Sequence, residues 1–242
     1  MIFAWLAFFD GMLAFALVAA GILGAHFYFA APFFGFQLFL FGFLLSIVGF
    51  VLGPLGILMT RSGQRRIARP RALVGTALSA AIAIPVLVVV LSSAKYPAIN
   101  DITTDFENPP EFVHAEMLVP NQGRDLKYSK EKYMPAQQRG YAPLVPGNVA
   151  GDPAAVFDRV RNIAATIPDW QITYTDPATM TIEGVCVSHL FHFQDDFIIQ
   201  VRSGPNGMSL VEMRSKSRDG VGDFGVNYNR IVMFMGKLQA AG

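Results

Sequence analysis

The sequence has very little cysteine and, at one end, very little charge. Cys186 is the only cysteine among 242 residues, so no intrachain disulfide can form and cysteine usage does not reveal the redox compartment. Residues 1–94 contain only six charged side chains: Asp10, Arg61, Arg65, Arg66, Arg69 and Arg71. A stretch of this length with so few charges is typical of membrane-embedded segments.

Several functional signatures are also missing. No G-x-S-x-G element is present to build the nucleophile elbow of a serine hydrolase. The glycine-containing stretch SGPNG at 203–207 does not precede a helix, so it is no phosphate loop. Residues 95–242 carry 14 Lys and Arg against 17 Asp and Glu, which excludes a basic nucleic-acid-binding surface. Nothing indicates a cofactor, and the sequence favours a non-catalytic protein over an enzyme.

Three long apolar runs are present, at roughly 4–30, 34–59 and 72–94. A hydrocarbon core about 30 Å thick requires about 20 helical residues at 1.5 Å each, and every run is long enough. The first run has no basic start, and it exceeds the ~7–15 apolar residues of a signal peptide. We therefore predict three transmembrane helices.

The stretch RSGQRRIARPR at 61–71 joins the second and third runs and holds all five arginines of the anchor. The positive-inside rule places this loop in the cytoplasm. The N-terminus is then cytoplasmic, and residues 95–242 face the periplasm from a bacterial inner membrane. A further interpretation of the arginines is contact with anionic lipid in the bilayer.

Glycine recurs every seventh residue in the second run, at Gly35, Gly42, Gly49 and Gly56. This spacing keeps the four residues on one helix face, where glycine lets helix backbones approach closely in lipid. We expect the spans to pack on each other. The alternative is that the stripe docks onto another membrane protein.

The remaining chain divides into a proline-rich extended strap, residues 95–151, and an α+β domain, residues 152–242. In the domain, Asp152 and Pro153 mark a helix start and Pro168 follows its end. Strand-like runs follow at 170–175, 180–188, 196–203 and 208–218, and SGPNG at 203–207 predicts a hairpin turn between the last two. A last helix follows Asp223. The predicted fold class is three transmembrane α-helices followed by an α+β domain of helix, four-stranded antiparallel sheet and helix, with the helices on one sheet face.

Alternation in the last two strands separates an apolar face from a polar face. The candidate ligand-binding residues on and near the polar face are Arg202, Arg214, Lys216, Arg218, Asp223 and Asn227. Their donors, with the N-terminus of the last helix, could hold an anionic lipid headgroup or the acidic segment of a partner. The interpretation we favour is a solvated face with cross-strand ion pairs.

Four possible zinc ligands occur at three-residue intervals: Cys186, His189, His192 and Asp195. Odd offsets in a strand point to opposite faces, so only a turn near His189 could bring them together. We therefore expect no metal. An envelope enzyme or a lipid-handling domain with its site near these residues is the alternative function.

Motifs in a fixed order resemble one family. They are YPAINDITTDFENPPEF at 96–112, a tryptophan at 170, IEGV at 182–185, FQDDFIIQVR at 193–202 and MRSKSRDGVGDFGVNYNRI at 213–231. Together they resemble domain-of-unknown-function family 1499, over nearly all of 96–238. Family members occur in bacteria and plastids, often behind N-terminal membrane spans, and a serine is usual where this chain has Gly222. The resemblance implies no established activity. The sequence as a whole favours a membrane-anchored interaction or ligand-binding module, for envelope maintenance or as an accessory of a membrane complex.

Overall fold

The structure is a computed structural model that describes residues 1–241, and it divides into two compact units. The first unit comprises Met1–Ser93 with His189–His192, and the second comprises Ala94–Ser188 with the chain from Phe193 onward. Each unit has its own packing and is described by itself.

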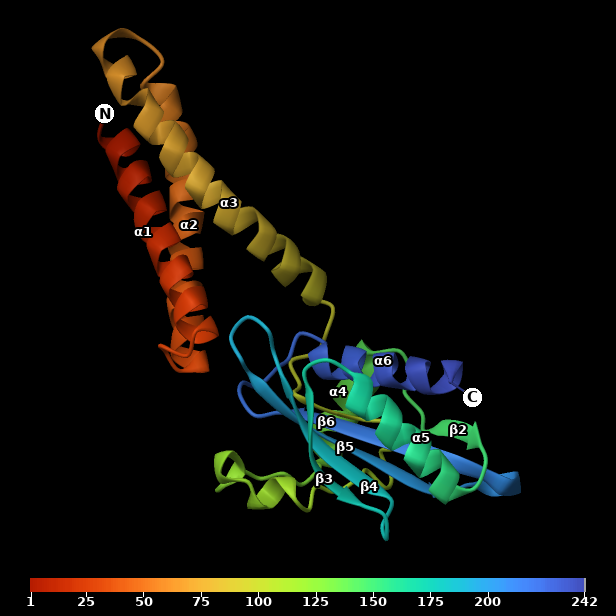
Figure 1. Ribbon diagram of the computed structural model, residues 1–242. Coiled ribbons are helices and arrows are strands. Elements are labelled where there is room, and N and C mark those ends of the chain that lie inside the picture. Colours follow the sequence, from red (N-terminus) through yellow and green to blue (C-terminus); the bar gives the residue numbers. More distant parts are fainter. Residues whose placement is uncertain (242) are drawn as a thin grey trace. The chain divides into compact units, whose positions relative to one another are not determined.

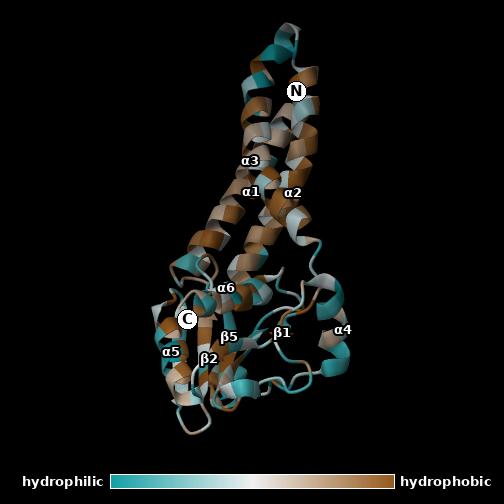
Figure 2. Ribbon diagram, turned by 90° about the vertical axis from the view of Figure 1, so that its right-hand side faces the viewer, coloured by the Kyte–Doolittle hydropathy of each residue, from teal (hydrophilic) through white to brown (hydrophobic). Residues whose placement is uncertain are grey.

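Three long helices make up most of the first unit (Figure 1). They are α1 (Ile2–His26), α2 (Pro32–Met59) and α3 (Arg69–Ser93), with a 3₁₀ segment, η1 (Gly63–Ala68), before α3. Hydrophobic residues dominate all three helices (Figure 2), and each is long and apolar enough to cross a membrane. The three predicted spans are confirmed by the length and the apolar composition of these helices, and the first unit is a membrane anchor.

The glycine face of α2 packs against both other helices. All four stripe glycines are buried. A Cβ on Gly42 would lie 2.7 Å from the carbonyl oxygen of Ala14 in α1, and one on Gly56 would lie 3.2 Å from the Cβ of Ala72 in α3. A side chain would not fit at Gly42 without a shift of the α1 backbone and would be crowded at Gly56, so the stripe serves the packing of the spans on each other.

The second unit contains one antiparallel sheet with the order β1-β6-β5-β4-β3, and β2 also pairs with β6. The strands are β1 (Asp101–Thr103), β2 (Gly147–Ala150), β3 (Trp170–Asp176), β4 (Thr181–Val187), β5 (Gln194–Ser203) and β6 (Met208–Ser217). The four strands β3 to β6 form the predicted meander. The predicted count of four strands is wrong, because the strap contributes β1 and β2.

Three helices accompany this sheet: α4 (Lys130–Gly140), α5 (Pro153–Thr166) and α6 (Val226–Ala240). Asp152 caps α5 as predicted, since its Oδ1 accepts from the backbone N–H groups of Ala154 at 3.0 Å and Ala155 at 3.2 Å. The apolar faces of α5 and α6 pack on the apolar sheet face and form one core. In this core the ring centroids of Trp170 and Phe197 are 4.2 Å apart.

The opposite sheet face is covered by the strap. Phe112, Ala115 and Leu126 of the strap form a second apolar cluster with Ile198 of β5. Most polar side chains of this face are consequently buried, and Arg214 has no exposed surface, whereas the Arg202 side chain is 39% exposed. The expectation of a solvated charged face is therefore wrong for its centre. Alternation identified the face, but it carried no information on the segment that covers it.

Candidate functional site

The centre of the polar sheet face is a buried ion cluster. Asp101 of β1 accepts two hydrogen bonds from Arg214 of β6, at 2.9 Å and 2.8 Å, and one from Lys216 at 2.9 Å. Arg214 also donates to the backbone carbonyls of Pro110 at 3.2 Å and Leu126 at 2.6 Å. The guanidinium thus holds β1 and two points of the strap against the sheet.

The remaining basic residues of the face also have carboxylate partners. Arg218 donates to Asp196 at 2.6 Å, and Arg124 of the strap donates to the same carboxylate at 3.2 Å. Arg202 pairs with Glu212. Burial raises the pKa of the Glu212 carboxyl, and the hydrogen bond from Arg202 opposes this effect. The binding of an anionic ligand by this face stays a prediction. In the structure, Arg202, Arg214 and Arg218 are paired with carboxylates of the same domain.

Asp223 and Asn227 fasten the start of α6. The Asp223 carboxylate accepts from the backbone N–H groups of Gly225 at 2.9 Å and Asn227 at 2.8 Å. Burial raises the pKa of the Asp223 carboxyl against these hydrogen bonds. The Asn227 side chain accepts from the Ser215 hydroxyl at 2.7 Å and donates to Ser217 at 2.9 Å. These groups tie α6 to β6.

The structure brings together two of the four possible zinc ligands. Cys186 and Asp195 lie opposite each other on β4 and β5, and Asp195 pairs with Arg230 of α6 at 2.6 Å. Burial raises the pKa of the Cys186 thiol to about 12. His189 and His192 belong to the first unit. Across residues 1–241, no three His, Cys, Asp or Glu side chains are grouped so as to hold a metal ion.

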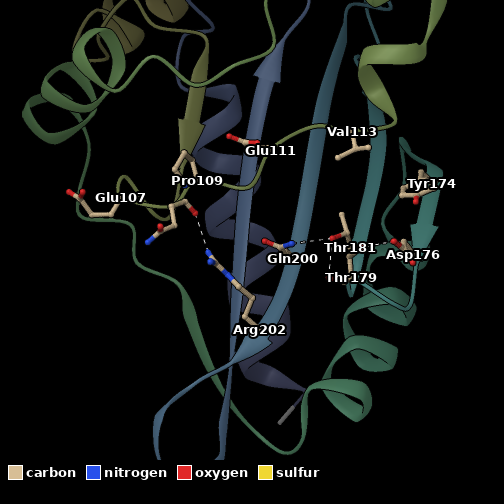
Figure 3. Close-up of a pocket in the computed structure, with 11 residues that line it drawn as sticks. Glu107, Pro109, Glu111, Val113, Tyr174, Asp176, Thr179, Thr181, Gln200 and Arg202 are labelled. Carbon is tan, nitrogen blue, oxygen red and sulfur yellow. Dashed lines mark hydrogen bonds between the residues drawn. The ribbon is translucent and has the colours of Figure 1, made fainter.

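A polar cleft of about 490 Å³ lies between residues 107–113 of the strap and strands β3, β4 and β5 (Figure 3). The cleft is lined mainly by polar side chains and by Pro109 and Val113. Its polar lining includes Glu107, Glu111, Tyr174, Asp176, Gln200 and Arg202. They come from segments far apart in the sequence that the sheet and the strap bring to one place.

Most walls of the cleft are held in place by hydrogen bonds. Arg202 donates to the carbonyl of Asn108 at 3.1 Å, and Gln200 donates to the hydroxyl of Thr181 at 3.3 Å. The Thr179 hydroxyl donates to Asp176 at 2.7 Å, which lowers the pKa of that carboxyl and keeps it ionised at neutral pH.

Two side chains of the cleft are suited to contact a ligand: the Glu111 carboxylate, as a hydrogen-bond acceptor, and the Tyr174 ring, as an aromatic surface. The exposed Glu111 carboxylate makes no hydrogen bond or ion pair with residues 1–241. Tyr174 is held by a stack with His114 of the strap, with ring centroids 5.0 Å apart and planes at 7°. The cleft therefore combines a fixed aromatic ring with an available acceptor.

The sequence indicated only one member of this cleft. Arg202 is one of the predicted ligand-binding residues, whereas Glu111 and Tyr174 carry no such signal in the sequence. The strand alternation that marks Arg202 also places Gln200 on the same face, so this part of the cleft could have been found. Glu111 lies in a proline-rich segment without a period, and its position depends on the path of the strap.

The fold and the cleft define a class of protein: a membrane anchor of three helices followed by an α+β domain whose second sheet face is closed by a strap. The family model described as "Protein of unknown function (DUF1499)" matches residues 101–238, from β1 into α6. The chain belongs to this family, which confirms the resemblance. No curated protein and no solved structure matches the chain significantly.

Proposed function

We propose that the protein is a non-catalytic binding module, anchored in the bacterial inner membrane, whose domain faces the periplasm. The cleft binds a polyhydroxylated ligand there, of which the glycan polymers of the envelope are the abundant example. Such binding suits a role in envelope maintenance or as an accessory of a membrane complex. The observation that carries the proposal is the cleft, with its ordered polar walls and the unpaired Glu111 carboxylate.

The chemistry of the cleft supports this ligand class. Carboxylates accept hydrogen bonds from hydroxyl groups, while Gln200 offers both a donor and an acceptor. Tyr174 supplies an apolar ring face beside these groups. The three carboxylates of the cleft outnumber its arginine even when Lys130, which pairs with Glu107, is counted as a second cation, and this excess disfavours an anionic ligand. A neutral or amine-bearing saccharide satisfies all of these conditions.

The orientation rests on the arginines around η1. Five arginines and no acidic residue lie between α2 and the first turn of α3, the only charged stretch of the anchor besides Asp10. Short loops with such an excess of arginine stay in the cytoplasm. An odd number of spans then leads the domain to the other side.

Cysteine labelling tests the orientation. We expect Asn162→Cys, on an exposed position of α5, to react with a membrane-impermeant maleimide in spheroplasts. Ser62→Cys, in the arginine loop, is expected to react only after the membrane is permeabilised. The wild-type protein is the control, because buried Cys186 with a thiol pKa of about 12 should stay unlabelled. The reverse labelling pattern would show that the domain is cytoplasmic.

Ligand binding is tested with the full-length protein in lipid nanodiscs and soluble envelope-glycan fragments, by calorimetry. Glu111→Gln and Tyr174→Ala are each expected to weaken binding by about ten-fold or more, since a hydrogen bond to a charged group and an aromatic contact are each worth about 1–3 kcal/mol. Glu116→Gln, an exposed change on the same strap outside the cleft, should bind as the wild type does. Equal binding by all variants, or none by the wild type, contradicts the proposal.

A further inference from the structure

A second cavity lies entirely within the membrane anchor. It is a groove of about 370 Å³ between the C-terminal end of α2 and the start of α3. Pro54, Ile57 and Leu58 give it an apolar wall, and Arg61 and Arg69 stand at its rim. Because the apolar part belongs to a spanning helix and the arginines follow it, the groove passes from hydrocarbon depth to headgroup depth.

The two rim arginines lack acidic partners. Asp10, in α1, is the one acidic residue of the first unit, and no ion pair joins Arg61 or Arg69 to a carboxylate of residues 1–241. The Nε of Arg69 is buried and has no hydrogen-bond acceptor. No hydrogen bond joins the side chain of Arg61 or Arg69 to an acceptor among residues 1–241 either, and both residues line the groove, so their terminal guanidinium nitrogens are available to a ligand there.

Arg71, in the same segment, differs from Arg61 and Arg69 because its guanidinium has partners within the protein. The Arg71 guanidinium stacks over the Trp5 ring at 4.2 Å from the centroid, and it donates to the carbonyl of Ile67 at 3.4 Å. Arg71 therefore has partners within the protein, whereas the groove arginines present their donors to whatever enters the groove.

We propose that this groove binds one anionic glycerophospholipid of the surrounding bilayer. The phosphate accepts hydrogen bonds from Arg61 and Arg69, and an acyl chain lies along Ile57 and Leu58. Charge complementarity selects the headgroup, because a zwitterionic lipid would bring a cation to a site that already holds two. The apolar wall selects a lipid over a free phosphate, which would leave that wall without a partner.

Native mass spectrometry of the full-length protein in mild detergent tests this proposal with added phosphatidylglycerol or phosphatidylcholine. The wild type is expected to retain phosphatidylglycerol selectively. The double variant Arg61→Gln/Arg69→Gln should bind it at least about 30-fold more weakly, because it loses two charge-assisted hydrogen bonds to the phosphate, each worth about 1 kcal/mol or more. The matched control is Arg65→Gln/Arg66→Gln, which removes the same charge from the same loop outside the groove and should change binding by less than about three-fold.

Two further measurements separate a groove from diffuse attraction. Ile57→Trp fills the groove and keeps every arginine, so it is expected to lower phosphatidylglycerol retention as the arginine variant does. Glycerol phosphate without acyl chains should not displace the lipid. Equal losses in both arginine variants, retention unchanged in Ile57→Trp, displacement by glycerol phosphate, or equal retention of phosphatidylcholine would each overturn the proposal.

Discussion

Asp101→Asn is expected to destabilise the second unit by about 3–5 kcal/mol, the usual cost of breaking a buried ion pair by removing one partner. Asp101 and Arg214 are completely buried, and Lys216 is 6% exposed. The neutral amide would leave two buried cations without a counter-charge, and it would point an N–H₂ group at one of their donors. Because β1 pairs with β6 through these residues, the strap should loosen together with the cluster.

The free energy of unfolding is measured by urea titration of the full-length protein in detergent. Trp170 reports on the second unit because it packs in the sheet–helix core, and a Trp5→Phe background removes the other tryptophan. Asp158→Asn is the matched control, since it removes an exposed carboxylate that pairs with Arg161 on α5. That surface pair should contribute no more than about 1 kcal/mol. Equal losses in both variants would show that the buried cluster does not hold the strap.

A double variant distinguishes unpaired charge from lost packing. Adding Lys216→Met to Asp101→Asn removes one of the orphaned cations and keeps a side chain of similar length. Part of the lost stability should return, so the two substitutions should not be additive. A strictly additive double variant would mean that the electrostatic account of Asp101 is wrong.

The elements that the sequence predicts best are those with a long period or a strong local signal. The apolar runs of the anchor exceed the length of a span, and Asp152 with Pro153 marks the start of α5. The turn SGPNG connects β5 and β6, with positive φ at Asn206 (56°) and Gly207 (69°). In each case the residues that determine the element lie within it.

The strap contains elements that local sequence patterns do not predict. Strands of three and four residues, such as β1 and β2, are too short to display alternation, and both are defined by pairing with β6 more than 50 residues away. Helix α4 contains Pro135, which argues against a helix locally. The side chain of Gln137 nevertheless bonds the backbone N–H and carbonyl of Thr103, at 3.2 Å and 2.7 Å, and anchors this helix to β1.

The cleft and the ion cluster were hard to predict for the same reason. Strand alternation places Arg214 and Glu183 on the polar face, but their partners lie in the strap, 68 to 113 residues away. Charged residues on a sheet face are usually solvated, and only the path of a distant segment turns them into a buried network. The cleft likewise exists only because residues 107–113 pass beside β3, β4 and β5.

Glu183 depends entirely on the path of the strap, because its carboxylate is fully buried and accepts hydrogen bonds from backbone N–H groups of the strap. Oε1 accepts from Val113 at 2.8 Å and His114 at 3.0 Å, and Oε2 accepts from Ala115 at 2.7 Å. These bonds attach the strap to β4 beside the cleft. Both carboxylate oxygens accept from backbone N–H groups. A glutamine side chain in either orientation would therefore place its N–H₂ group against at least one backbone N–H, and two donors cannot form a hydrogen bond.

Glu183→Gln is therefore expected to release this part of the strap locally, at a cost of about 2–4 kcal/mol for hydrogen bonds to a charged acceptor. Hydrogen exchange of the full-length protein should show the amides of residues 113–115 exchanging about 100-fold faster, while the amides of β5 and β6 keep their protection. Glu116→Gln, on the same segment and exposed, should leave the exchange of these amides unchanged. Loss of protection throughout the sheet would mean that Glu183 supports the whole fold, and unchanged protection at 113–115 would mean that the strap is held by its apolar contacts alone. Local release is the outcome that the three bonds predict, because the Phe112 cluster and the Asp101 cluster hold the strap at other points.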